Sequence, residues 1–201
     1  MRIGILGGTF DPVHQGHISL ATCAIKSHAL DKVIFMPTGI KTYKTANCKV
    51  SDENRLEMLK IAIRSDSRLQ VDPYEMQIGK IGYTSETLDY IHSIYPEDDI
   101  FFIIGADSLM YIHKWHNPKD IFEKCTIISG NRIVDGDINK QKAFLESKYS
   151  CSILLMDGPD VKISSSEIRD MLLKRELDAL NHFMPYGVLE YILERNLYIN
   201  A

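Results

Sequence analysis

Residues 1–30 read MRIGILGGTFDPVHQGHISLATCAIKSHAL: an apolar run, a turn with three glycines and two histidines, and a stretch with helical spacing of apolar residues. A short apolar run that ends at glycine is typical of a strand buried on both faces of a sheet. After the first run, at 1–6, similar runs recur at 32–36, 100–104, 125–129 and 152–156. These five runs predict five buried strands.

Helix-like stretches, with apolar residues three and four positions apart, separate these strands at 16–30, 52–64, 84–94 and 139–147. The alternation predicts an α/β fold, a Rossmann-like open parallel sheet with right-handed crossovers and helices on both faces. Two further helical stretches, 164–174 and 186–194, predict a small C-terminal helical cap. We expect a single domain over 1–201, of which 164–201 is the helical part.

The composition is that of an ordinary globular protein. Of the 201 residues, 45% are hydrophobic and 25% are charged, which argues against disordered, collagen-like and coiled-coil chains. The net charge of −4, from 23 basic and 27 acidic side chains, argues against a protein that holds nucleic acid by overall positive charge. We therefore expect no nucleic-acid partner.

The four cysteines, Cys23, Cys48, Cys125 and Cys151, include no Cys-x-x-Cys pair and indicate reduced thiols rather than a zinc site. No apolar stretch approaches the roughly 20 residues that span a bilayer. The first residues lack the basic leader of a secretory signal. We expect a cytoplasmic protein without a membrane partner, and the sequence leaves open whether it forms a homo-oligomer.

The turn at 7–17 is the most informative segment of the chain. In an open parallel sheet, ligands bind beyond the carboxyl ends of the strands, where the strand order reverses, and the first strand commonly borders that crevice. We expect Gly7 and Gly8 to adopt unusual dihedrals there and to let a ligand approach the backbone. The free N–H groups of the following helix attract anions. The turn therefore predicts a phosphate site.

His14 and His17 are three residues apart at the start of the predicted helix, so their imidazoles are expected to face the same side. Gly16 lies between them and is expected to leave room for a ligand. Their ring N–H groups can donate to phosphate oxygens, more strongly as charge builds in a transition state. Alternatively, the two histidines are surface imidazoles or a weak metal pair. The turn matches neither the dinucleotide fingerprint nor the Walker loop, which argues against hydride transfer and a Walker-type ATPase.

Residues 163–169, Ile-Ser-Ser-Ser-Glu-Ile-Arg, begin a second helix in which Ser164 and Glu167 form a capping box. Such a box alone serves helix stability, but serine hydroxyls and Arg169 beside free N–H groups also make a triphosphate site. After the strand at 100–104, Gly105 lets a nucleotide lie close to the backbone. Asp107 is either a helix N-cap or an acceptor for ribose hydroxyls.

Trp115, the only tryptophan, lies in a polar segment, where its ring either packs partly buried or stacks on a positively charged pyridinium. Thr84 is a candidate helix cap beside unpaired N–H groups, which bind a carboxylate in preference to a neutral amide. Residues 39–51 form the longest stretch without periodicity and contain Lys41 and Lys44. This stretch predicts a functional or mobile loop.

The string Gly-Gly-Thr-Phe-Asp-Pro-x-His-x-Gly-His at 7–17 resembles the nucleotidyltransferase superfamily with a His-x-Gly-His motif, and within it the bacterial-type nicotinate mononucleotide adenylyltransferases. The segments 163–169 and 103–107 resemble that family's second phosphate-binding motif and its nucleotide crevice. The chain departs from the family pattern at 81–82, where the family often has Pro or Ser. It departs further at 37–44, where the family often has Pro-Pro-His-Lys.

The resemblance implies an enzyme of NAD biosynthesis that joins ATP and nicotinate mononucleotide (NaMN) into deamido-NAD and pyrophosphate by direct in-line attack. Mg²⁺ is then carried by ATP, with no metal cage of protein ligands. The resemblance implies catalytic roles for His14, His17 and Arg169. It also implies ATP contacts at Gly7, Gly8, Thr9, Phe10, His17, Gly105, Asp107, Ile163, Ser164, Ser165 and Arg169, and mononucleotide contacts at Thr9, Asp11, Lys44, Thr84, Trp115 and Arg132.

The sequence leaves several points open. Either Lys41 or Lys44 contacts phosphate, and Arg55 and Arg132 lie where the family has arginines, although Arg55 alternatively only pairs with a neighbour. The same chemistry fits an adenylyltransferase for nicotinamide mononucleotide or phosphopantetheine. A non-catalytic ATP-binding protein of the same fold is a further alternative. Small-molecule nucleotides are the expected partners in every case.

Overall fold

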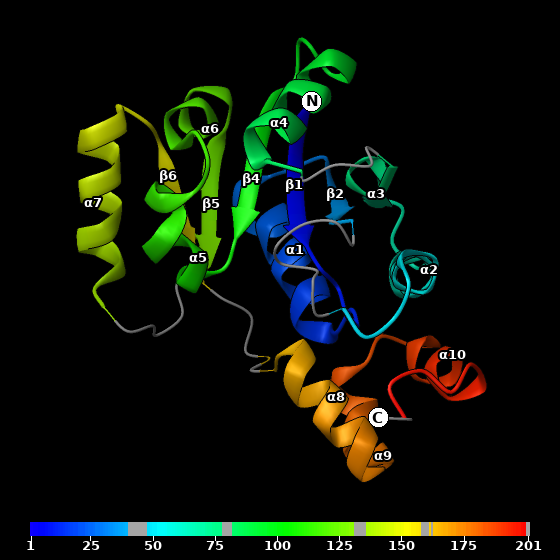
Figure 1. The fold of residues 1–201 in the computed structure, drawn as a ribbon. Coiled ribbons are helices and arrows are strands. Elements are labelled where there is room, and N and C mark those ends of the chain that lie inside the picture. Colours follow the sequence, from blue (N-terminus) through cyan, green and yellow to red (C-terminus); the bar gives the residue numbers. More distant parts are fainter. Residues whose placement is uncertain (40–47, 78–81, 131–135, 158–160, 162, 200–201) are drawn as a thin grey trace.

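The structure, a computed structural model, describes residues 1–39, 48–77, 82–130, 136–157, 161 and 163–199. In these ranges six parallel strands form one open sheet in the order β3-β2-β1-β4-β5-β6 (Figure 1). The strands are β1 (Arg2–Gly8), β2 (Lys32–Pro37), β3 (Leu69–Val71), β4 (Asp99–Ile104), β5 (Thr126–Gly130) and β6 (Ile153–Met156). The strand order reverses between β1 and β4, and the predicted Rossmann-like parallel sheet is confirmed.

The strand β3 is absent from the sequence-based prediction. It is three residues long and pairs with β2 at the edge of the sheet. So short a segment carries too little alternation to be distinguished from a loop. Its strand conformation therefore depends on the tertiary pairing with β2.

The predicted helices are present, and several short helices add to them. The predicted ones are α1 (Gln15–His28), α2 (Asp52–Ile63), α4 (Thr84–Ile94), α7 (Ile138–Tyr149), α8 (Ser165–Lys174) and α10 (Val188–Glu194). The additional ones are α3 (Tyr74–Gln77), α5 (Ala106–Tyr111), the 3₁₀ turn η1 (Ile112–Lys114), α6 (Pro118–Lys124) and α9 (Leu177–Phe183). Each additional helix has seven residues or fewer, which is too short for a clear helical period.

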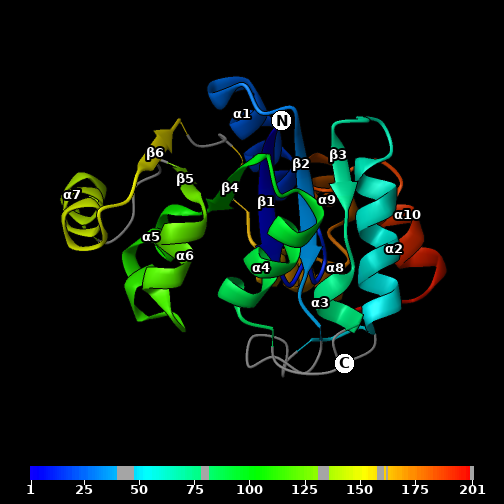
Figure 2. The same ribbon diagram turned by 90° about the horizontal axis from the view of Figure 1, so that it is seen from above.

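Successive strand residues point alternately into two buried clusters, one on each face of the sheet. Ile3 and Ile5 of β1 belong to the cluster that includes residues of α4, α5, α6 and α7, whereas Leu6 belongs to the cluster with α1 and α2. Figure 2 shows this layering, with α1 on one side of the row of strands and α4, α5 and α6 on the other. The expected helices on both faces of the sheet are thus confirmed.

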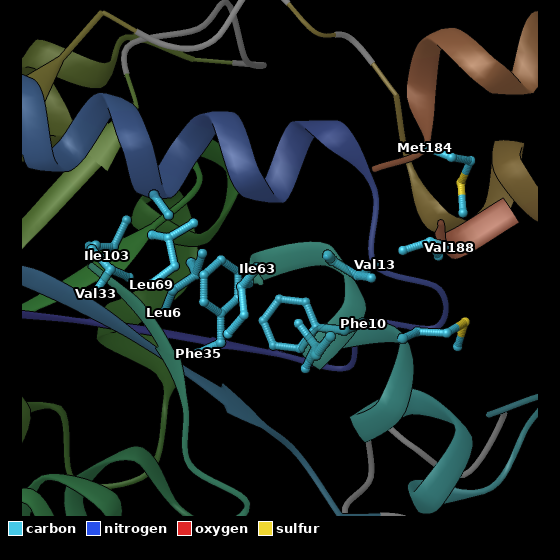
Figure 3. Packing of buried hydrophobic residues seen from close by; sticks show 14 of the residues in the cluster. Leu6, Phe10, Val13, Val33, Phe35, Ile63, Leu69, Ile103, Met184 and Val188 are labelled. Atoms are coloured by element: carbon cyan, nitrogen blue, oxygen red, sulfur yellow. The ribbon is translucent and has the colours of Figure 1, made fainter. Parts of the chain in front are cut away.

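The helices α8, α9 and α10 lie at the end of the molecule to which the arrows of β4 and β5 point (Figure 1). Leu180, Met184 and Val188 share a core cluster with residues of β1 and α2 (Figure 3). Tyr191 Oη in α10 donates a hydrogen bond to Asn54 Oδ1 in α2 at 2.9 Å. Within the described ranges, no helix combines the length and the apolar character that a membrane crossing requires.

Candidate active site

A cavity of about 600 Å³ opens at the carboxyl ends of β1 and β4, where the strand order reverses. Its walls include the end of β1, Gly105 after β4, and His14 and His17 at the start of α1. A second cavity of about 350 Å³ shares His17 and Ser165 with the first. A ligand at this edge of the sheet therefore meets the turn between β1 and α1.

Phe10, rather than the two glycines, provides the unusual backbone conformation of this turn. Gly7 and Gly8 are the last residues of β1 and neither has a positive φ, whereas Phe10 has a φ of 50°. The Phe10 ring is 1% exposed and its centroid lies 5.6 Å from that of Phe35 (Figure 3). A Cβ on Gly8 would lie 2.9 Å from Phe10 Cζ. The prediction of unusual dihedrals at the glycines is therefore wrong, and Gly8 instead makes room for the Phe10 ring.

His14 and His17 form a stacked pair at the N-terminus of α1. Their ring centroids are 3.7 Å apart and their planes differ by 27°. The backbone N–H of His14 donates to His17 Nδ1 at 3.2 Å, so a neutral His17 ring carries its proton on Nε2. The expectation that the two imidazoles face the same side is confirmed, and His17 keeps Nε2–H as a donor for a ligand.

Both imidazoles are uncharged at neutral pH. Burial lowers the pKa of His14 to about 4, although the nearby Glu167 carboxylate acts in the opposite direction. Burial, followed by the neighbouring His14, lowers the pKa of His17 well below its ordinary value. The pair can therefore act on phosphate oxygens through directed N–H groups rather than through positive charge.

Gly16 lies tightly against the His14 ring. A Cβ at this position would lie 3.0 Å from His14 Nδ1 and 3.1 Å from His14 Cε1, which is tighter than ordinary contacts. A side chain here would therefore displace the His14 ring. Gly16 lines the larger cavity as expected, but the room that it leaves is first of all room for an imidazole.

Two hydrogen bonds tie the start of α8 to the turn after β1. Ser165 Oγ donates to Pro12 O at 2.9 Å, and Arg169 Nη1 donates to Asp11 O at 2.6 Å. The N-termini of α1 and α8 therefore converge on the two cavities. Because free N–H groups and the helix dipole favour anions at such ends, this arrangement suits two anions side by side.

The predicted capping box of α8 is present. Glu167 N–H donates to Ser164 Oγ at 3.3 Å, and Ser164 N–H donates to Glu167 Oε2 at 2.8 Å. Ile163, Ser164 and Ser165 line the larger cavity. The hydroxyl of Ser164 donates to Glu167 Oε2 at 2.6 Å, and that of Ser165 donates within the protein too. The groups that α8 offers to an anion are therefore mainly its first N–H groups and Arg169.

The end of β4 places Gly105 and Asp107 in the wall of the larger cavity. Gly105 is the N-cap of α5 and Asp107 lies in its first turn, so the alternative in which Asp107 is the N-cap is wrong. A Cβ at Gly105 would lie 3.7 Å from Asp107 Oδ1, an ordinary contact. The protein's own packing therefore does not require glycine at this position.

Trp115 and Thr84 line another part of the same cavity. Trp115 is half-buried, and its ring meets Phe102 edge-on at 6.3 Å between centroids. Thr84 is the first residue of α4, and the N-cap is Tyr83, so the prediction of Thr84 as the cap is wrong. Tyr83 stacks on His116 with 4.0 Å between centroids. The cavity thus has an aromatic wall beside a helix N-terminus.

Sequence analysis missed several residues of the cavity wall, among them Thr38, Glu75, Tyr83 and His116. Thr38 follows β2, and its N–H donates to Gly8 O at 3.0 Å. Because β2 pairs with β1, the end of the predicted strand at 32–36 was the signal that could have indicated Thr38. Tyr83 and His116 adjoin residues that the sequence did select. Glu75 lies in the four-residue helix α3, where no periodicity marks it.

Comparison with known proteins assigns the chain to a family. Residues 5–171 match the family model described as cytidylyltransferase-like. The chain is 39% identical to a Clostridium kluyveri protein named "Probable nicotinate-nucleotide adenylyltransferase", over 98% of this chain and 99% of that protein. A Clostridium botulinum protein of the same name is 37% identical over 98% of both. The chain belongs to the nicotinate-nucleotide adenylyltransferase family.

Solved structures agree with the fold of this member of the adenylyltransferase family. The Plasmodium falciparum nicotinic acid mononucleotide adenylyltransferase complexed with NaAD has a TM-score of 0.78 at 20% identity, covering 98% of this chain and 97% of that chain. The same protein complexed with APC has a TM-score of 0.76 at 21% identity, covering 98% and 96%. These likenesses confirm the Rossmann-like architecture.

In this member of the family, Arg55 has an internal role. Its side chain is 0% exposed, and it donates from Nη1 to Thr9 O at 2.5 Å and from Nη2 to Thr38 O at 2.6 Å. It also pairs with Asp52, three residues earlier, so the expected pairing with a neighbour is confirmed. Arg55 joins the segments that follow β1 and β2 and thereby supports the floor of the site.

The remaining candidate residues divide into two groups. Thr9 and Asp11 line the smaller cavity, where the Asp11 side chain is nearly buried. Lys41, Lys44 and Arg132 lie outside the described residues.

Proposed function

We propose that this chain joins ATP and NaMN into deamido-NAD and releases pyrophosphate, as an enzyme of NAD biosynthesis. The observation that carries the proposal is the convergence of α1 and α8 on two cavities that share His17 and Ser165. Adenylyl transfer brings two anions together, the phosphate that attacks and the triphosphate that is cleaved. Two adjacent helix N-termini at the switch point of the sheet suit this requirement.

The reaction needs no side-chain nucleophile. A phosphate oxygen of NaMN attacks the α-phosphorus of ATP in line, and a new phosphorus–oxygen bond forms. The bond from the α-phosphorus to the bridging oxygen breaks, and pyrophosphate leaves with the electron pair. Because the attacking phosphate is already anionic at neutral pH, the protein contributes positioning and stabilisation of the developing charge.

We assign the reacting α-phosphorus to the site at the start of α1 and the departing pyrophosphate to the site at the start of α8. His17 donates from Nε2 to an α-phosphate oxygen, beside His14 and the segment Gly7, Gly8, Thr9 and Phe10. Arg169 and the first N–H groups of α8, at Ser165 and Ser166, hold the pyrophosphate beside Ile163 and Ser164. Gly105 and Asp107 accommodate the adenosine part of ATP.

The mononucleotide is assigned to the aromatic side of the larger cavity. The Trp115 ring suits a positively charged pyridinium through stacking and cation–π attraction. The N-terminus of α4 at Thr84 suits the nicotinate carboxylate. Thr9, Asp11, Lys44 and Arg132 complete the proposed mononucleotide contacts.

Mg²⁺ is proposed to be carried by ATP. At the starts of α1 and α8 the converging groups are imidazole N–H, guanidinium and helix N–H groups, which are donors for phosphate oxygens rather than ligands for a cation. Mg²⁺ on the triphosphate supplies charge neutralisation. We further propose that residues 1–201 act as one domain, in the cytoplasm, on small nucleotides and without nucleic acid, in keeping with the net charge of −4.

Pyrophosphate release from ATP and Mg²⁺ tests the function, with NaMN, nicotinamide mononucleotide and phosphopantetheine compared at equal concentrations. We expect a strong preference for NaMN. Preference for nicotinamide mononucleotide would leave adenylyl transfer supported but would contradict the carboxylate site near Thr84. Binding of ATP without release in all three assays supports the non-catalytic alternative, and the His17→Ala variant controls for contaminating activity.

A further inference from the structure

The carboxylate of Asp11 is held by the protein on both of its oxygens. The side chain is nearly buried, with 4% of the residue exposed. Tyr198 Oη donates to Asp11 Oδ1 at 2.7 Å, and the backbone N–H of Lys49 donates to Oδ2 at 3.0 Å. Arg169 Nη1 lies 3.9 Å from Oδ2 and donates to the main-chain oxygen of Asp11. This carboxylate is thus occupied by internal donors.

These donors come from segments that are distant in the sequence. Lys49 precedes α2, Arg169 belongs to α8, and Tyr198 follows α10. All three meet at a residue only three positions before His14. The orientation of the turn that carries the histidines therefore depends on contacts made from the other end of the chain.

The backbone of Tyr198 indicates that its position is imposed by its surroundings. Its φ is 62°, in the left-handed region that bulky side chains rarely adopt. Such a conformation persists where packing and hydrogen bonds over-determine it, and Tyr198 packs against the core cluster of β1 and α2. Burial, and then the charge of Asp11, raise the pKa of Tyr198, so the hydroxyl stays protonated and remains a donor.

We infer that Tyr198 is a positioning residue: its hydroxyl fixes the Asp11 carboxylate and, through it, the turn that presents His14 and His17. The inference rests on the proposed function for its kinetic consequence. It also gives Asp11 a second part, as a fixed point of the turn, beside the mononucleotide contact proposed for it.

The kinetic test compares Tyr198→Phe with Tyr191→Phe. Each variant loses one hydroxyl from the C-terminal region, but Tyr191 donates to Asn54 in α2 and not to Asp11. We expect Tyr198→Phe to lower kcat about tenfold, because small misplacement of catalytic groups is costly, with KM for both substrates little changed. Tyr191→Phe is expected to keep the wild-type kcat. Unchanged turnover in Tyr198→Phe, or an equal loss in both variants, overturns the inference.

A second variant pair tests whether Tyr198 acts through Asp11. In an Asp11→Ala background, Tyr198→Phe is expected to change kcat no further, because the carboxylate that it positions is gone. An additional tenfold loss in that background overturns the inference.

A measurement without turnover separates this inference from the proposed function. The ¹⁵N signals of His14 and His17 in histidine-labelled protein are expected to shift in Tyr198→Phe and to stay in place in Tyr191→Phe. Unmoved signals in Tyr198→Phe overturn the inference. If wild-type protein transfers adenylate to no mononucleotide, the proposed function fails, while the histidine signals still decide the role of Tyr198.

Discussion

The two proposed anion sites, at the starts of α1 and α8, offer different groups to a phosphate. The first presents His14 and His17, which burial keeps uncharged at neutral pH. The second presents Arg169, whose side chain is 25% exposed and carries a permanent charge. A buried charge is costly whereas a partly solvated one is tolerated, so direction and charge are divided between the sites. In the proposed reaction, the directed N–H groups of the histidines lie where the bond changes, and the charge of Arg169 lies where pyrophosphate departs.

Their surroundings differ as well. The first site rests on a buried floor, with Phe10 in the core and Arg55 holding the main-chain oxygen of Thr9. The second is joined to it by the hydrogen bonds of Ser165 and Arg169. We therefore expect changes in the first site to affect turnover and changes in the second to affect ATP affinity.

Removing the Nε2–H donor of His17 is expected to have the largest effect on turnover. His17→Ala is expected to lower kcat by about 10²–10³, the usual loss for one preorganised donor, while KM for ATP changes far less. Steady-state pyrophosphate release measures both constants. His17→Gln, which restores an N–H donor, is expected to recover part of the rate. A folded His17→Ala protein with wild-type turnover would remove His17 from the reacting centre.

The uncharged state of the first site predicts a pH dependence of stability. The folded pKa of His14 is about 4, below its unfolded value of about 6.5. Between these values the unfolded chain binds a proton that the folded chain refuses, so stability falls as the pH decreases from about 6.5 to 4. The loss from His14 amounts to about 3 kcal/mol. Urea unfolding at pH 7, 6, 5 and 4 measures it, and His14→Asn is expected to make the profile less steep, while His17 supplies a remaining slope. Equal stability of the wild type at pH 7 and 5 would contradict a buried neutral His14.

The charged site is expected to respond in affinity. Arg169→Met removes a charge-assisted donor worth about 2 kcal/mol, so KM for ATP is expected to rise about thirtyfold with a smaller change in kcat. The rise is expected to shrink at high salt, which screens a partly exposed charge. Arg169→Lys is the control that keeps the charge. A fall in kcat at constant KM would move Arg169 to the reacting centre and weaken the division between the sites.

The smallest expected effect separates capping from binding in α8. Ser164→Ala removes the N-cap acceptor for Glu167 N–H and is expected to cost about 1 kcal/mol of stability. Thermal unfolding measures this loss. Ser166→Ala, inside the same first turn and exposed, is the matched control and is expected to be nearly neutral. A large rise in KM for ATP in Ser164→Ala, without loss of stability, would make its hydroxyl a ligand contact.

The sequence was sufficient where local pattern decides the structure. The apolar run before Gly7 predicts β1, and the spacing of Ser164 and Glu167 predicts their capping box. The strand β3 and the left-handed Phe10 escaped prediction because each depends on a neighbour distant in the sequence, β2 in one case and Phe35 in the other. Arg55 remained ambiguous for the same reason, since Thr9 and Thr38 approach it only in the folded chain.

The hydrogen bond from Tyr198 to Asp11 spans 187 positions of the chain. A ribosome makes residue 198 long after residue 11. The sheet strands and α1 are complete well before then, yet Tyr198, which holds the first turn through Asp11, has not been made. A nascent chain that has not yet reached residue 198 therefore carries its histidines without the hydrogen bond that we infer to orient them.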